Sequence, residues 1–322
     1  MNQNRFEALH GADWLALEQQ LRLLEQGKPL GTLAADFPAA YRRLCQQLAL
    51  AESRAYSASL VERLQQLCLR AHQQLYRPRR NLAPRLLGFI LHGFPRQVRA
   101  AWRSILLASL LFYVSLLGMG LLVYLFPELI YSLQSPEQVA QMERMCDPDA
   151  RRLGPFAERG SSDDWLMFGF YIMNNIGIAF QTFASGLLFG LGSLFFLLFN
   201  GLNIGAIAGH LLRIGYEETF LSFVIGHGAF ELTAITFAGA AGLQLGGALL
   251  APGPRSRRAA LRAAARGSVG LIAGVIGLLL IAAFIEAYWS SITRFPASLK
   301  YAVGTALWLL VGTYFLLAGR RR

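Results

Sequence analysis

The segment Gly226-His227-Gly228-Ala229-Phe230-Glu231-Leu232 places two ionisable side chains four residues apart within a long apolar run. Residues i and i+4 share a helix face, so we expect His227 and Glu231 to lie side by side. An ionisable side chain at bilayer depth costs roughly 2.5–3.5 kcal/mol or more, and such residues usually face a bundle interior or a functional site. The pair therefore predicts either a hydrogen bond that fixes helix packing or a group used in binding or transport.

The composition around this segment is that of a membrane protein. Hydrophobic residues make up 54% of the 322 residues and charged residues 15%. A soluble domain of this length carries more charge. We therefore expect an all-α integral membrane protein, a polytopic helical bundle of about six spans with a helical domain before it.

Residues 1–103 are expected to form a cytoplasmic helical domain followed by a basic juxtamembrane segment. They lack the short apolar run and small-residue cleavage site of a signal peptide. Apolar residues recur at helical spacing and predict two or three packed helices. The residues in the two runs are Trp14, Leu17, Leu21 and Leu24, and then Leu44, Leu48, Ala51, Ala55, Leu60, Leu64 and Leu67.

The bundle itself is expected to occupy residues 104–319, because about 20 apolar residues cross the hydrocarbon core. The expected spans are 104–126, 165–184, 186–212, 220–250, 268–288 and 299–318. The junction at 183–186 is short for a turn between two full spans. One of the segments within 165–212 is therefore alternatively re-entrant or interfacial, shielded by the rest of the protein.

Charge asymmetry predicts the orientation of these spans. Residues 1–103 hold fifteen Lys/Arg and seven Asp/Glu, whereas the loop 127–165 holds four Lys/Arg and eight Asp/Glu. Basic loops remain on the cytoplasmic side, so both termini, the loop 251–267 and the tail 320–322 are expected there, with 127–165 outside. Arginines expected at the membrane surface are Arg96, Arg99, Arg103, Arg255, Arg257 and Arg258. The same rule accounts for these arginines without nucleic-acid binding.

Amide and imidazole side chains within the spans predict a buried polar centre. Asn174, Gln181 and Ser185 share one helical stripe, and Asn200, Asn203 and His210 lie within a narrow arc. Hydrogen bonds between helices explain each residue singly. Taken together, three consecutive segments contribute polar groups. The predicted centre comprises His227, Glu231, Asn174, Asn175, Asn200, Asn203, His210 and Gln181.

Small residues recur every four positions and predict close helix packing, because they let helix backbones approach. The glycines concerned are Gly186, Gly190, Gly201, Gly205, Gly209, Gly226, Gly228, Gly270 and Gly274. This pattern supports a compact bundle and leaves homodimer formation open.

These residues together resemble the stage II sporulation protein M family of membrane proteins. The resemblance covers roughly residues 40–320 and rests on Asn174-Asn175, Asn200-Gly201 and above all Gly-His-Gly-x-Phe-Glu-Leu at 226–232. In spore formers the family scaffolds a complex with peptidoglycan hydrolases. In other organisms its members are associated with MoxR-type AAA ATPases and RDD-type membrane proteins, and the long amino-terminal region here is typical of that broader group.

The sequence does not predict an enzyme. His227 and Glu231 offer two zinc ligands and His210 a candidate third, but a catalytic site needs three well-placed ligands, so no metal is predicted. No phosphate-binding Gly-x-x-x-x-Gly-Lys-Ser/Thr loop occurs, and no cofactor is expected. Cys45, Cys68 and Cys146 are too few and scattered for a disulfide framework.

The resulting hypothesis is a non-enzymatic scaffold, or a component of an envelope-associated complex, in the inner membrane. The resemblance implies a MoxR-type ATPase, an RDD-type membrane protein or an envelope protein as partner. The alternative is a transporter, channel or lipid-translocating protein whose path is lined by the residues of the polar centre, chiefly His227 and Glu231, with His227 carrying or sensing protons near neutral pH.

Overall fold

The computed structural model describes residues 1–26, 36–75, 82–148, 161–292 and 294–320, with the side chains of 161–164 left out of the description. Over these ranges the chain is helical and contains no strand. Two compact units are formed, Met1–Leu82 and Ala83–Arg322. The predicted all-α fold class is confirmed.

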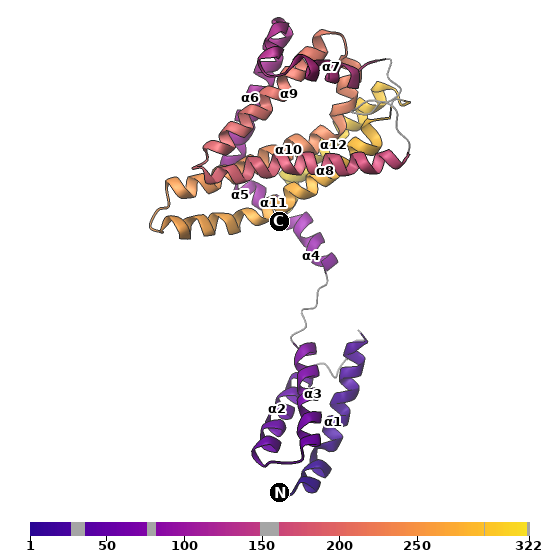
Figure 1. The fold of residues 1–322 in the computed structure, drawn as a ribbon, viewed down its shortest axis with the longest axis vertical. Coiled ribbons are helices and arrows are strands. Elements are labelled where there is room, and N and C mark those ends of the chain that lie inside the picture. Colours follow the sequence, from indigo (N-terminus) through magenta and orange to yellow (C-terminus); the bar gives the residue numbers. More distant parts are fainter. Residues whose placement is uncertain (27–35, 76–81, 149–160, 293, 321–322) are drawn as a thin grey trace. The chain divides into compact units, whose positions relative to one another are not determined.

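The first unit is a bundle of α1 (Gln3–Glu25), α2 (Phe37–Ser53) and α3 (Ala58–Leu75) (Figure 1). Asn2 caps α1 by accepting a hydrogen bond from the backbone N–H of Arg5. The three helices bury one apolar stripe each, formed by Phe6, Trp14, Leu17, Leu21, Phe37, Leu44, Ala51, Leu60, Leu64, Leu67 and Ala71. Ala55 lies outside these helices: its φ of 51° is left-handed and belongs to the turn between α2 and α3.

Cys45 and Cys68, 23 residues apart in sequence, meet across α2 and α3 with their sulfur atoms 3.1 Å apart. Both are free thiols. Burial, and then the hydrogen bond with Cys45, raise the pKa of Cys68 to about 12. Cys68 therefore stays protonated at neutral pH and is a poor nucleophile.

We expect residues 1–82 expressed alone to fold as a soluble helical domain, because their core is complete within the unit. Leu64 is fully buried, so Leu64→Ala should lower the free energy of unfolding by about 2–5 kcal/mol. Leu69 on the same helix is 59% exposed, and Leu69→Ala should change it by less than about 0.5 kcal/mol. Urea unfolding followed by circular dichroism tests this, and equal effects of the two substitutions would contradict the described core.

The second unit begins with α4 (Leu82–Gly88), a π-helical turn η2 (Phe89–Gly93) and α5 (Phe94–Ala100), and it continues as the membrane bundle. The remaining elements are α6 (Trp102–Leu125), η3 (Pro127–Ser132), α7 (Pro136–Met145), α8 (Ser161–Ala184), η4 (Ser185–Leu187), α9 (Leu191–Arg213), α10 (Glu217–Leu250), α11 (Arg257–Ile285), η5 (Glu286–Ser290) and α12 (Ala297–Leu317). The central helix is α10, which contacts α6, α8, α9, α11 and α12 (Figure 1).

The basic juxtamembrane segment belongs to this second unit, whereas the sequence grouped it with the amino-terminal domain. Arg99 Nη1 donates to Phe315 O at 2.8 Å, and Arg96 Nε donates to Gly319 O at 3.3 Å. The two guanidinium groups thus satisfy carbonyl groups at the end of α12, where a helix favours positive charge. The entry to α6 and the exit from α12 therefore lie at the same end of the bundle.

Within the described residues, five helices are long and apolar enough to cross a membrane: α6, α9, α10, the combined helix Arg257–Ser290, and α12. One expected span, 165–184, is helical as part of α8 but does not belong to this set. Asn174, Asn175 and Gln181 lower the hydropathy of α8, although it has the length of a span.

The short junction between α8 and α9 is a 3₁₀ turn, η4, followed by two residues in the left-handed region, Phe189 (φ 54°) and Gly190 (φ 85°). The expected span 186–212 thus begins five residues late, at Leu191. A side chain at Gly186 would overlap the backbone of Gly242, and one at Gly246 would overlap Gly190. The turn is therefore seated directly on α10.

Glycines bring α6 and α9 into backbone contact along their length. Side chains at Gly201, Gly205 and Gly209 would overlap backbone atoms of Phe112, Leu116 and Gly120, respectively. On α11, Gly270 faces Gln97 and Gly274 faces Phe94 in the same close manner. These glycines are therefore occupied by contacts within one chain.

Candidate functional site: a buried ionisable centre

The predicted pair on α10 lies inside the bundle. His227 is 5% exposed, and its Nε2 stands 4.0 Å from Glu231 Oε2. This separation exceeds hydrogen-bond reach. The imidazole packs edge-on against Phe223, with ring centroids 5.3 Å apart. The two side chains are neighbours, as i,i+4 spacing requires, with room between them.

The end of α11 supplies the other half of the centre. There the helix continues as a π-helical turn, η5, which carries Glu286 and Ser290. His227 Nδ1 lies 3.1 Å from Ser290 Oγ. One donor atom from each of His227, Glu231 and Glu286 lies within 4.8 Å of the other two. Three potential ligands thus converge, although Glu286 is 55 residues from Glu231 in sequence.

Lys300, in the first turn of α12, completes the centre. Its side chain is 2% exposed, and Nζ donates to the backbone carbonyl of Ser290 at 2.8 Å. Ser290 therefore links α10 and α12 through its hydroxyl and its carbonyl. We did not predict Glu286 or Lys300 from sequence, although each is an ionisable residue within an expected span, which is itself a signal of function.

Gly226 permits the close approach of α10 to η5. A methyl group at this position would lie 3.3 Å from Ile285 Cγ2 and 3.7 Å from Trp289. At Gly228 the nearest neighbour of such a group is Val224 on the same helix. Of the two glycines that flank His227, Gly226 is therefore the one that faces the end of α11 closely.

The residues of α8 do not join this centre as a group, which corrects the sequence interpretation. Asn174 and Gln181 are exposed on the outer face of α8. Asn175 is buried, and its Oδ1 accepts a hydrogen bond from Asn174 Nδ2 at 3.0 Å. The inner face of α8 instead carries Met167, Tyr171, Asn175, Ala179 and Thr182. Amide spacing alone does not reveal which face of a helix is turned inward.

The α9 residues form a second, separate polar cluster with the loop 127–165. His210 Nε2 lies 2.8 Å from Glu143 Oε1 on α7, and Gln134 Nε2 donates to Asn203 Oδ1. Asn200 instead donates to the carbonyl of Phe196 on its own helix, at 2.7 Å. His210 and Asn203 therefore attach α9 to the segment between α6 and α8. They lie in a different cluster from His227 and Glu231, so the predicted single centre is wrong.

The remaining surface arginines lie at two places. Arg103 packs over the Trp102 ring, 5.4 Å from its centroid. Arg255, Arg257 and Arg258 are exposed around the turn between α10 and α11. Both groups are available for contact with anionic headgroups.

The fold and this centre define the class of the molecule: a polytopic α-helical membrane protein with ionisable side chains buried between its helices. The family described as Stage II sporulation protein M matches residues 86–291, and the chain belongs to this family. The matched range includes His227, Glu231 and Glu286 and ends before Lys300. The family resemblance noted in the sequence is thereby confirmed.

The amino-terminal unit matches a different family. Residues 4–77, which contain α1 to α3, match a domain of unknown function, DUF8413.

An uncharacterized protein of Methanocaldococcus jannaschii is 28% identical over 75 residues, which are 23% of this chain and 42% of that protein. The chain thus matches less than half the length of that relative. No solved structure matches the chain.

Proposed function

We propose that this protein is a non-enzymatic scaffold of an envelope-associated complex, in which the amino-terminal unit recruits a soluble partner to the membrane bundle. The observation that carries this proposal is the division of the chain into two units with separate cores and separate family matches. A separately folded helical module in the same chain as a membrane bundle suits recruitment better than it suits a transport path. A MoxR-type ATPase is the partner that the family resemblance favours.

The proposed location is the inner membrane with both termini in the cytoplasm. Arg99 bonds the last turn of α12 and Arg96 bonds Gly319 just beyond it, so the entry and exit of the bundle share one face. An even number of crossings meets this requirement, with α8 as the sixth. The basic turn at Arg255, Arg257 and Arg258 then belongs on the cytoplasmic side by the positive-inside rule.

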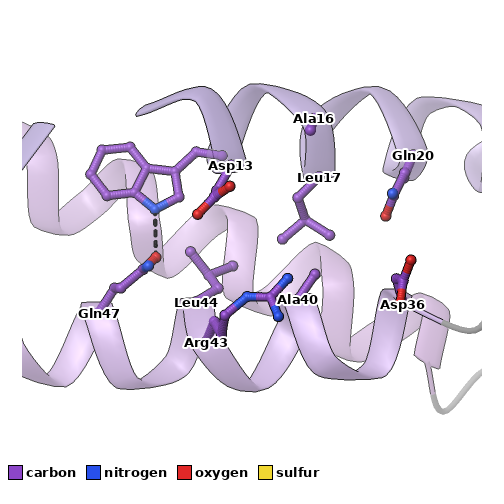
Figure 2. Close-up of a pocket in the computed structure, with 10 residues that line it drawn as sticks. Asp13, Ala16, Leu17, Gln20, Asp36, Ala40, Arg43, Leu44 and Gln47 are labelled. Carbon is purple, nitrogen blue, oxygen red and sulfur yellow. Dashed lines mark hydrogen bonds between the residues drawn. The ribbon is translucent and has the colours of Figure 1, made fainter. Parts of the chain in front are cut away.

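A polar cavity between α1 and α2 is the proposed docking surface on the amino-terminal unit. Figure 2 shows Asp13, Gln20, Asp36 and Arg43 around it, with Leu17 and Leu44 projecting between the two helices. Trp14 Nε1 donates to Gln47 Oε1 at 2.7 Å at one end of the cavity and so fixes the two helices relative to each other. Charged side chains on a rigid frame favour a specific partner.

The test is affinity capture of the tagged full-length protein from native membranes, with mass spectrometry. We expect a stoichiometric ATPase with the wild type and its loss on deletion of residues 1–82. Arg43→Glu should reduce its recovery at least tenfold, whereas Arg63→Glu on α3 makes the same charge change elsewhere and should not. If the wild type captures no stoichiometric partner, the scaffold proposal fails.

A transporter or lipid-translocating protein is the second candidate, favoured by the cluster of His227, Glu231, Glu286 and Lys300. Two cavities on the membrane bundle suit an ion or a polar solute poorly, because apolar side chains line them. One lies between α8 and α11 and is lined by Ile176, Phe180 and other apolar residues. The other lies around Phe94 and Tyr314 and is lined by residues of α4, η2, α5, α10, α11 and α12. Uptake or lipid-movement assays in reconstituted vesicles would distinguish the two functions.

A further inference from the structure

We propose that His227, Glu231 and Glu286 form a binding site for a transition-metal dication of the zinc class, which joins α10 to the end of α11. The first argument is the set of donors. An imidazole nitrogen and two carboxylate oxygens, all within 4.8 Å of one another, come from two helices. Imidazole with carboxylate suits Zn²⁺ and its first-row neighbours, whereas Mg²⁺ and Ca²⁺ favour oxygen ligands only.

The second argument is the orientation of the histidine. Its Nδ1 faces Ser290 Oγ at 3.1 Å. When Nδ1 donates its proton to this hydroxyl, Nε2 is left with its lone pair, and Nε2 is the atom that faces Glu231. Metal-ligating histidines characteristically use their second nitrogen in such a hydrogen bond, which fixes tautomer and ring orientation. Ser290 is itself held by Lys300 Nζ through its carbonyl.

The third argument is the backbone. Glu286 and Ser290 both lie on the π-helical turn η5, and π-helical turns occur frequently at functional sites. The wider turn changes the direction of the side chains relative to a continued α-helix. It brings a carboxylate and the hydroxyl that orients His227 to the same place on α10. Gly226, where an added methyl group would crowd Ile285, keeps the helices close enough for this contact.

The spacing of the donors fits binding with a small adjustment. In an occupied tetrahedral site, ligand bonds of about 2.0–2.2 Å separate the donor atoms by roughly 3.4 Å. His227 Nε2 and Glu231 Oε2 stand 4.0 Å apart. The whole donor set lies within 4.8 Å, so binding requires both carboxylates to rotate toward the imidazole. Both carboxylates lie in the interior of the bundle, where a bound dication would offset the cost of burying their negative charge.

The experiment measures zinc bound by the full-length protein in detergent, in a Cys45→Ser, Cys68→Ser background because paired thiols bind zinc themselves. After incubation with zinc chloride and desalting, we expect about one zinc per chain by elemental analysis. Glu286→Gln and His227→Gln should weaken zinc binding more than about tenfold in competition with a chromophoric chelator. His210→Gln, which changes the other buried histidine, should retain the wild-type affinity.

Two further measurements separate ligand loss from misfolding. Ser290→Ala keeps all three ligands but removes the hydrogen bond to His227, so it should weaken zinc binding by about tenfold or more. Zinc should raise the melting temperature of the wild type and of His210→Gln but not that of Glu286→Gln. The proposal is overturned if the wild type retains no zinc. In that case a proton shared between the two carboxylates, and not a metal ion, would stabilise them. It is equally overturned if Glu286→Gln binds zinc as tightly as the wild type.

Discussion

Replacing Gly205 with leucine should drive α6 and α9 apart and lower the free energy of unfolding by about 3 kcal/mol or more, the upper range for an overfilled core. A side chain at this position meets the backbone of Leu116. Backbone atoms have no alternative rotamer, so the helices themselves must separate. Because Gly201 and Gly209 make the same kind of contact with α6, their packing is lost together with that of Gly205. Unfolding in mixed detergent and sodium dodecyl sulfate micelles measures the effect.

The matched control is Gly118→Leu. Gly118 also lies within a membrane helix, α6, but a methyl group added there has no neighbour within 4 Å. We expect the free energy of unfolding to stay within about 0.5 kcal/mol of the wild type. Equal losses at Gly118 and Gly205 would show that the backbone contact between α6 and α9 is not what stabilises the bundle.

Replacing Lys300 with methionine should destabilise the bundle by about 1–3 kcal/mol, the cost of leaving a buried carbonyl without its hydrogen-bond donor. The substitution leaves the carbonyl of Ser290 without its donor inside the bundle. Methionine has a similar length and no charge, so lost packing contributes little. The same micelle unfolding assay measures this effect at neutral pH.

Arg262→Met is the control for Lys300→Met. It removes one positive charge from an exposed position on α11. Its free energy of unfolding should differ from that of the wild type by less than about 0.5 kcal/mol. If Lys300→Met proved as stable as the wild type, the ammonium group would have no part in holding η5 and α12 together.

Local sequence patterns predicted the class, the helices and the central pair. The alternation of apolar and polar residues in 1–75 is a property of each helix taken alone, and it located the stripes that pack in the first unit. The i,i+4 relation of His227 and Glu231 likewise needs no tertiary information. The left-handed turn at Ala55 escaped prediction because alanine rarely adopts that conformation and carries no signal for it.

The sequence predicted the composition of the site less completely. Amide spacing on α8 predicted one polar stripe facing inward, but Asn174 and Gln181 face outward. Helical periodicity relates residues to one another and does not orient the helix in the bundle. The glycine pattern, by contrast, indicated close backbone approach without naming partners, and the partners of Gly201, Gly205 and Gly209 all lie on α6.

By itself, then, the sequence determined that this is a helical membrane protein of the stage II sporulation protein M family, with two ionisable residues sharing a helix face. Only the tertiary structure decided that Glu286, Ser290 and Lys300 join them, and that His210 belongs to a different cluster with Glu143. The physical reason is the sequence distance over which each kind of information extends. Periodicity acts within one helix, whereas the ionisable centre depends on a π-helical turn and on the close packing of separate helices, which bring together residues more than 50 positions apart.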